Sequence, residues 1–340
     1  MKFSKTTVCL ILVIIFGLVG FLIGKNSKKA TALTTNSTET KPPSSNDYWS
    51  APDTSELDHS EESELIRYGR ELIANTSYYL GPNGTVASVT NGMNCQNCHL
   101  DAGTKAWGNN YGGVYSMYPI YRDRSGSEET IFKRVSDCIE RSLNGKAPDT
   151  TSREMQAIQK YIQWLGKEVP PKTKPPGAGL KELPFMNRAA DTSKGRQVFI
   201  AKCQRCHGVD GEGVRNSNSG SYYVYPPLWG EYSYNTGAGL FRLTRFAAYV
   251  KYNMPFDLKS DTVLSVEEAW DVAAFVNSQK RPQKNFIQDW PDISKKPIDH
   301  PFGPYTDGFT EAQHKYGPFD PIKKRREELK KKDNTVASNK

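Results

Sequence analysis

Cysteine is scarce in this sequence of 340 residues, which contains only six. Four of them stand in two short repeated motifs, and Cys9 lies inside an apolar run near the N-terminus. Only Cys138 is left over, so the sequence offers no obvious disulfide pair.

The central part of the chain lacks an excess of positive charge. The net charge is +8, but residues 1–29 contain five lysines and no acidic residue, and residues 323–340 contain eight basic and three acidic residues. The residues between these ends carry a slight negative excess. We therefore expect no nucleic-acid surface on the folded part and predict no nucleic-acid partner.

A C-x-x-C-H motif occurs twice, and it is the attachment signature of c-type haem. Two thiols at this spacing reach the vinyl groups of one porphyrin, and the adjacent histidine binds its iron. A zinc ribbon would place its two C-x-x-C pairs about 15–20 residues apart, whereas these pairs are 108 positions apart. A thiol redox pair needs neither the histidine nor a second copy. We therefore predict two covalently bound haem c groups and redox chemistry, with these binding residues: Cys95, Cys98, His99, Cys203, Cys206 and His207.

The N-terminus has the form of a signal sequence, because Lys2 and Lys5 precede an apolar run from Thr7 to Gly24. Residues 1–24 are either cleaved, at a small-residue site near 30–32, or retained as a membrane anchor. Residues 25–55 are rich in Ser, Thr, Asn and Pro and are predicted to be a flexible linker. Attachment of haem c in bacteria requires export, so we expect a periplasmic protein, either soluble or anchored to the inner membrane.

The rest of the chain shows an internal duplication, since similar segments around Gly69 and Gly195 each precede a haem motif. Helical spacing of apolar residues predicts a closing helix for each copy, at 153–166 and 265–278. The fold class is therefore mainly α, with two class I cytochrome c-like domains in tandem, at 56–168 and 191–281. A Pro-rich linker at 169–190 joins them, and an irregular C-terminal strap at 282–322 and a basic tail at 323–340 follow.

A low-spin haem needs a second axial ligand. In the second domain the candidate is Met254, which stands 47 positions after His207 and precedes a proline. The alternative for Met254 is ordinary core packing. Lys251 is close enough to compete for the iron in one redox state, or it is simply a surface lysine.

In the first domain Cys138 takes the place of a methionine, 39 positions after His99. It lies on a predicted helix that begins after Ser127 and ends at Gly145, within an apolar stripe that should face the interior. The alternative is a buried thiol without a metal, in which case Met117 or Met155 would be the rival ligand. The predicted iron ligands are therefore His99, Cys138, His207 and Met254.

Basic residues and a hydroxyl surround Cys138. Arg134 and Ser142 lie one helical turn to either side of it, Arg124 precedes the helix and Lys146 follows it. Such a group beside a thiolate is suited to a small oxyanion. The alternative is ordinary solvated charge, or pairing with haem propionates.

These residues resemble the dihaem thiosulfate dehydrogenase family, some members of which also reduce tetrathionate. The resemblance runs from about residue 65 to residue 322, and its most specific part is the segment from Asp137 to Lys146. It implies that two thiosulfates and tetrathionate are interconverted at a His99/Cys138 haem, and that a His207/Met254 haem passes electrons to a small c-type cytochrome. It further implies that the sulfonate oxygens are held by Arg124, Arg134, Ser142 and Lys146, and that Cys138 is catalytic. Two other functions are compatible with two haem motifs, namely a dihaem electron carrier without a substrate and a dihaem peroxidase.

Overall fold

The computed structural model describes residues 48–216, 223–256, 258 and 260–338. All of them belong to one compact unit, Pro43–Lys340. The expected signal sequence or anchor and most of the expected linker therefore lie outside the described residues. Among those that are described, no helix is both long enough and apolar enough to cross a bilayer.

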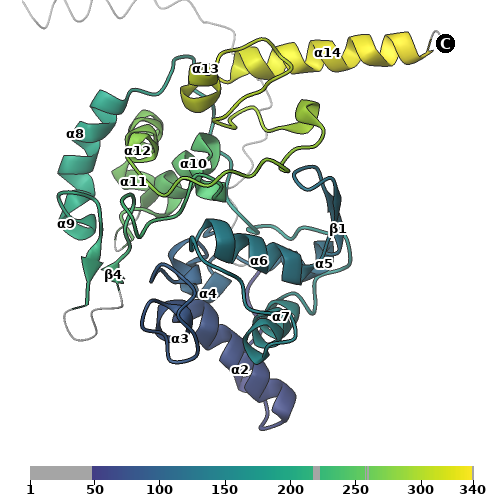
Figure 1. Cartoon of the computed structure of the whole chain (residues 1–340), viewed down its shortest axis with the longest axis vertical. Helices are drawn as coiled ribbons and strands as arrows, with labels where there is room; N and C mark the ends of the chain where they lie inside the picture. The colour runs from purple at the N-terminus through teal and green to yellow at the C-terminus, as the bar shows by residue number, and fades with distance from the viewer. Residues whose placement is uncertain (1–47, 217–222, 257, 259, 339–340) are drawn as a thin grey trace, which may run out of the picture. The chain divides into compact units, whose positions relative to one another are not determined.

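The chain is mainly helical (Figure 1). The helices and 3₁₀ helices of the first half are η2 (Thr54–Glu56), α2 (Glu61–Ala74), α3 (Thr76–Leu80), η3 (Cys95–Asn97), α4 (Leu100–Gly103), α5 (Val114–Met117), α6 (Ile131–Arg141) and α7 (Arg153–Leu165). Those of the second half are α8 (Thr192–Lys202), α9 (Gln204–His207), η4 (Gly239–Phe241), α10 (Leu243–Asn253), α11 (Ser260–Val263), α12 (Val266–Ser278), η5 (Ile293–Lys295), α13 (Glu311–Tyr316) and α14 (Asp320–Ser338). Two antiparallel hairpins complete the set, β1 (Ile120–Arg122) with β2 (Ser127–Glu129), and β3 (Val214–Arg215) with β4 (Tyr223–Tyr225).

Each half is built on one helix crossing. In the first half α2 packs against α7, and in the second α8 packs against α12. Glycine allows both close approaches, because a Cβ atom at Gly69 would overlap the carbonyl of Ala157 and one at Gly195 would overlap the carbonyl of Asp271. The duplication expected from the sequence is thus visible as the same crossing made twice.

The helix ends follow local capping chemistry. The Ser60 hydroxyl accepts a hydrogen bond from the Ser63 amide and caps α2, and acidic residues fill the first turn of that helix. The prediction that Ser127 caps the cysteine-bearing helix is wrong. Residues 127–129 form β2, and the hydroxyl of Thr130 caps α6 by accepting from the amide of Lys133. Residues 142–145 lie beyond the end of α6.

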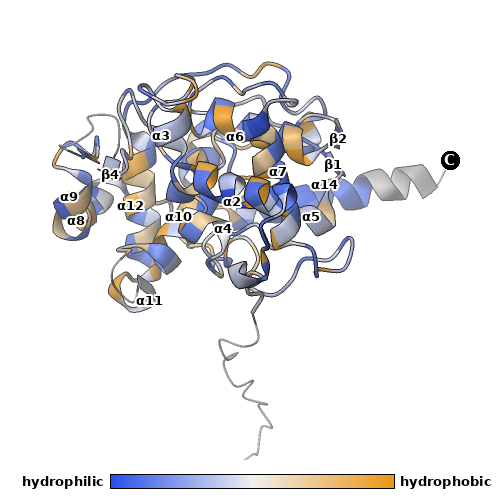
Figure 2. Cartoon of the chain, turned by 90° about the horizontal axis from the view of Figure 1, so that it is seen from below, coloured by the Kyte–Doolittle hydropathy of each residue, from blue (hydrophilic) through white to orange (hydrophobic). Residues whose placement is uncertain are grey.

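The segments outside the two crossings lie against them. Trp49, within the expected flexible linker, packs on the core of the first half, and its amide donates to the carbonyl of Pro176. Leu180 and Leu183, from the Pro-rich segment, are buried. The expected basic tail is helical as part of α14, which carries mostly hydrophilic residues, in contrast to α12 (Figure 2). Ile322 is fully buried at the start of α14.

Candidate active site

Both motif histidines are held in the same way. Nδ1 of His99 lies 2.6 Å from the carbonyl oxygen of Asn109, and Nδ1 of His207 lies 2.9 Å from that of Pro226. A carbonyl oxygen can only accept, so Nδ1 carries the proton in each ring and Nε2 keeps its lone pair for a metal. The ring of His99 also stacks on Tyr111, with 4.6 Å between the ring centroids. The two imidazoles are therefore oriented as haem ligands.

The surroundings of both motifs fit a haem. The four motif thiols are free, so each can form a thioether. Cys98 and His99 line a cavity of about 960 Å³, which we call the main cavity. His207 and Met254 line one second, mostly apolar cavity together with core residues of the second half, as expected for the two axial ligands of one iron.

Cys138 lines the main cavity, on α6, and its sulfur makes a hydrogen-bond contact with the imidazole of His99. Nδ1 of His99 is engaged with Asn109, so we infer that Nε2 faces this sulfur. A hydrogen bond between these two atoms needs a proton on one of them, and a metal bound by both would take the place of that proton. Burial raises the pKa of the Cys138 thiol, but the positive charge of Arg134 and the contact with His99 outweigh it and lower this pKa to about 6. The thiolate is therefore the main form near neutral pH. Met117 and Met155, the rival ligands, do not line the cavity, and Met155 is buried in another cluster.

Arg134 lies on the same row of α6 as Cys138, and Ser142, the C-cap residue of α6, continues this row because its backbone keeps helical dihedrals. Both line the main cavity with Cys138. No described residue forms an ion pair or side-chain hydrogen bond with the guanidinium of Arg134. The negative charge of Cys138 raises the pKa of Arg134 above its ordinary value. Arg124 also lines the cavity, but its Nη2 is 2.6 Å from Oδ2 of the buried Asp137. The fourth predicted anion ligand, Lys146, is exposed and lies outside the cavity lining.

In the second half, Met254 directly follows α10 and is half-buried. Lys251, the possible competitor, is buried on α10 but does not line the apolar cavity. The two cavities are neighbours, because Cys98 and Leu240 line both of them. The hydroxyl of Tyr249 donates to the carbonyl of Asn97 across the contact between the halves, at 2.8 Å.

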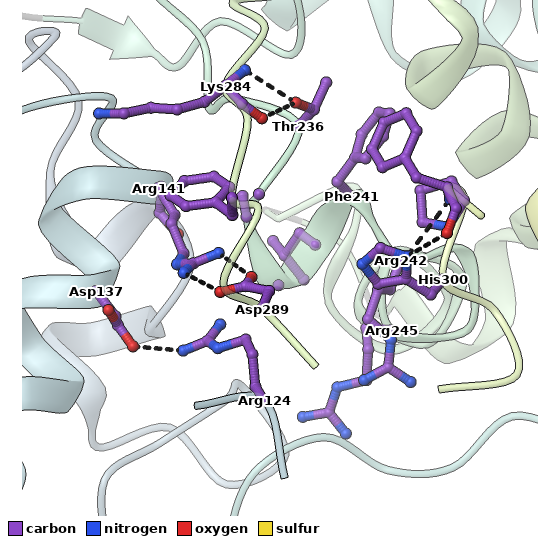
Figure 3. A pocket seen from close by; sticks show the side chains of 18 of the residues that line it. Arg124, Asp137, Arg141, Thr236, Phe241, Arg242, Arg245, Lys284, Asp289 and His300 are labelled. Atoms are coloured by element: carbon purple, nitrogen blue, oxygen red, sulfur yellow. Dashed lines mark hydrogen bonds and ion pairs between the residues drawn. The ribbon is translucent and has the colours of Figure 1, made fainter. Parts of the chain in front are cut away.

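Sequence reasoning did not find a large part of the main cavity. Its lining includes Arg122 of the β1–β2 hairpin, Arg141 at the end of α6, and Arg242 and Arg245 at the start of α10. From the strap it includes Lys284, Asp289, Lys296 and His300. Figure 3 labels all of these except Arg122 and Lys296. The sequence predicts that the strap lies on the domains, but no motif indicates which surface it covers. A signal was available only in the high arginine content of segments 122–141 and 242–245.

The strap is fixed to the first half at two points. Arg141 is 6% exposed, and its guanidinium donates to both carboxylate oxygens of Asp289, at 2.7 and 2.9 Å. The same guanidinium lies 3.6 Å from the ring centroid of Phe286. The amide of Trp290 donates to the carbonyl of Arg124. The strap thereby forms one wall of the cavity that contains Cys138.

Comparison with known proteins agrees with this architecture. The family model of cytochrome c matches residues 192–280, and the model described as SoxA/TsdA, cytochrome c domain, matches residues 85–170. The thiosulfate dehydrogenase of Stutzerimonas stutzeri strain A1501 is 38% identical over 236 residues, which is 69% of this chain and 74% of that protein. This chain belongs to the thiosulfate dehydrogenase family. It is accordingly a dihaem oxidoreductase with two covalently bound haem c groups.

Two further relatives support this assignment. The thiosulfate dehydrogenase of Psychrobacter arcticus is 37% identical over 242 residues, covering 71% of each chain. The solved structure of thiosulfate dehydrogenase (TsdBA) from Marichromatium purpuratum, in its as-isolated form, matches with a TM-score of 0.65 and 31% identity. That match covers 80% of this chain and 54% of the other, so the present chain spans about half of the TsdBA chain.

Proposed function

We propose that this protein interconverts two thiosulfates and tetrathionate in the main cavity. The observation that carries the proposal is the position of Cys138. Its sulfur contacts the imidazole of His99, and the charge of Arg134, in the same cavity, helps to lower the pKa of its thiol to about 6. Arg134 has no carboxylate partner among the described residues. A free cation beside a thiolate, in a cavity rich in arginine, suits a small sulfur oxyanion.

The first haem would be held by thioethers to Cys95 and Cys98, with His99 and Cys138 as axial ligands. The second would be held by Cys203 and Cys206, with His207 and Met254 as axial ligands. When bound, each haem accepts and returns one electron, and thioether ligation of the second raises its potential. The residues fit these roles because both imidazoles keep Nε2 available and each partner sulfur lines the same cavity as its histidine.

Arg134 and Ser142 would bind the sulfonate oxygens of a thiosulfate and point its terminal sulfur at Cys138. Arg124, partly neutralised by Asp137, would contribute from the hairpin side. A thiolate of low pKa is suited to act as a nucleophile. Forming a bond between the Cys138 sulfur and the terminal sulfur of thiosulfate releases two electrons, one for each of the two bound haems. Attack of a second thiosulfate on that terminal sulfur then releases tetrathionate and restores the Cys138 thiolate, so the balance is two thiosulfates to one tetrathionate and two electrons.

We further propose that electrons leave through the second haem to a small c-type cytochrome, and that the protein works in the periplasm. The shared lining residues Cys98 and Leu240 support a short route between the two haems. The apolar run at 7–24 supports export.

The test is steady-state kinetics of the dihaem protein in both directions. Thiosulfate with an oxidised small cytochrome c, and tetrathionate with a reduced electron donor, should both support turnover. A protein whose haems are reduced and oxidised by partners, but which turns over neither sulfur compound, would be an electron carrier and would contradict the proposal. Hydrogen peroxide should not serve as an electron acceptor.

A further inference from the structure

The main cavity receives guanidinium groups from both halves of the chain. Four of its arginines have carboxylate neighbours: Arg124 has Asp137, Arg141 has Asp289, Arg242 has Asp299, and Arg122 lies 3.9 Å from Glu129. Arg134 and Arg245 have no ion pair or side-chain hydrogen bond with any described residue. The first belongs to α6 of the first half and the second to α10 of the second half. The cavity therefore contains two arginines without a carboxylate partner among the described residues, one from each half, and the thiolate of Cys138 is the anion nearest to Arg134 in charge effect.

Arg245 faces the interior of the cavity. Its side chain is accessible to solvent, and the space that it lines is the same one that Cys138 lines. In Figure 3 no dashed line reaches Arg245, whereas dashed lines join Arg124 to Asp137 and Arg141 to Asp289. Arg242 is paired with Asp299, which does not line the cavity. Although solvent reaches this side chain through the cavity, the protein around its guanidinium partly desolvates it. This desolvation, the nearby Arg242, and the more distant Arg134 and Arg122 lower the pKa of Arg245, with Asp299 opposing them. Arg245 is thus close enough to feel the positive charges beside Cys138.

Two like charges facing one space repel each other unless an anion lies between them. Tetrathionate is such an anion, since it carries a sulfonate at each end and two bridging sulfurs in the middle. Oxidation of two thiosulfates likewise requires two sulfonates to be held apart while their terminal sulfurs meet. A single cation cluster beside Cys138 would hold only one of them.

We propose that Arg245 binds the second sulfonate, so that tetrathionate spans the cavity from Arg134 in the first half to Arg245 in the second. This inference rests on the proposed function and assigns Arg245 a substrate-binding role within it. A haem propionate is also an anion that could pair with Arg245, and the experiment separates the two sources.

The experiment measures binding to the fully oxidised dihaem protein by isothermal titration calorimetry. Without a source of electrons tetrathionate is not turned over, so its affinity can be measured directly. Sulfate is the second probe, because it resembles one end of tetrathionate. The variants are Arg245→Ala, Arg245→Lys and Arg134→Ala, and the matched control is Arg196→Ala, an exposed arginine of the second half that lines neither cavity.

We expect Arg245→Ala to weaken tetrathionate binding by about ten- to hundredfold, the usual effect of losing a charge-assisted hydrogen bond. Sulfate, which occupies the site at Arg134, should keep its affinity within about twofold. Arg245→Lys should restore part of the loss, Arg134→Ala should weaken both anions, and Arg196→Ala should change neither.

Unchanged tetrathionate affinity in Arg245→Ala would overturn the inference, as would an equal loss for both anions. A lowered reduction potential of the first haem with unchanged tetrathionate affinity would instead assign Arg245 to a propionate. If the wild-type protein neither bound tetrathionate nor oxidised thiosulfate, the proposed function itself would be wrong, which is a different outcome from failure of the Arg245 inference alone.

Discussion

The imidazole of His99 and the sulfur of Cys138 contact each other in the main cavity, although the two residues belong to different elements. His99 is fixed by the carbonyl of Asn109 and by the ring of Tyr111, and Cys138 by its place on α6. The two proposed iron ligands are thus each held in place by their own surroundings, and this arrangement is the basis of the first prediction.

Replacing Cys138 by glycine should abolish turnover and leave both haems attached. The thioethers depend on four other cysteines, so the absorption spectrum should still show two haems per chain, while the band pattern of the first haem changes. We expect the rate of thiosulfate oxidation to fall by about 10³-fold or more, as is common when a nucleophile is removed. Wild-type turnover in Cys138→Gly would show that this sulfur has no part in the chemistry.

Replacing Arg134 by alanine should raise the thiosulfate concentration needed for half-maximal rate by about ten- to hundredfold, because a charged hydrogen-bond donor is lost. Lys146→Ala is the comparison, since Lys146 is exposed and lies outside the main cavity. It should change the same quantity by no more than about twofold. An equal effect of the two substitutions would mean that general positive charge, rather than the position of Arg134, determines affinity.

The ion pair between Arg141 and Asp289 should hold the strap in place. Arg141→Ala leaves the partly buried carboxylate of Asp289 without its partner, and we expect it to reduce the free energy of unfolding by about 3 kcal/mol. Thermal unfolding of Arg141→Ala, Asp289→Ala and the double variant measures this coupling. Strictly additive effects would show that the pair contributes nothing as a pair.

Alanine at the two crossing glycines should destabilise each half separately. A Cβ atom at Gly69 meets backbone of α7, which cannot move aside easily, so Gly69→Ala should cost about 1–3 kcal/mol. Arg70→Ala, at an exposed position on the same helix, should cost less than about 1 kcal/mol. Chemical unfolding followed at each haem band assigns the loss to one half, and an equal loss in both halves would contradict the separate crossings.

Stability should fall in acid because of two buried aspartates in the strap. Burial alone would raise the pKa of both carboxyl groups. At Asp299 the effect of Arg242 and Thr244 outweighs burial and lowers the pKa. At Asp307 chiefly Arg326 does the same. A carboxyl with a lowered folded-state pKa contributes stability that is complete above its unfolded pKa of about 4 and is lost as the pH falls through the folded value.

The melting temperature should therefore be nearly constant just above pH 5 and decline below pH 4. In Asp299→Asn it should be lower at neutral pH and decline less steeply in acid. A decline of equal slope in this variant and in the wild type would exclude Asp299 as a contributor.

The sequence predicted those features of the fold and the site that depend on residues close together in the chain. The closing helices expected at 153–166 and 265–278 are present as α7 and α12. Arg134, Cys138 and Ser142 share a cavity because helical spacing places them in one row. Ser127 was misassigned because pairing with the strand at 120–122, a tertiary interaction, outweighs its capping preference.

The distant part of the cavity was not predictable in this way. Arg245 and Asp289 reach it from segments whose order along the chain says nothing about the surface they cover. Lys146 is a residue that sequence reasoning placed in the site but that lies outside it. It is close to Cys138 in sequence, but α6 ends at Arg141 and the chain then leaves the cavity.

The contact between Arg141 and Asp289 joins positions 148 residues apart. A chain is synthesised from its N-terminus. Both pairs of haem-binding cysteines are therefore made before the strap residues, such as Asp289, that form one wall around Cys138. A product truncated before residue 282 would lack this wall, and it would also lose Phe319 and Ile322 from the core of the second half.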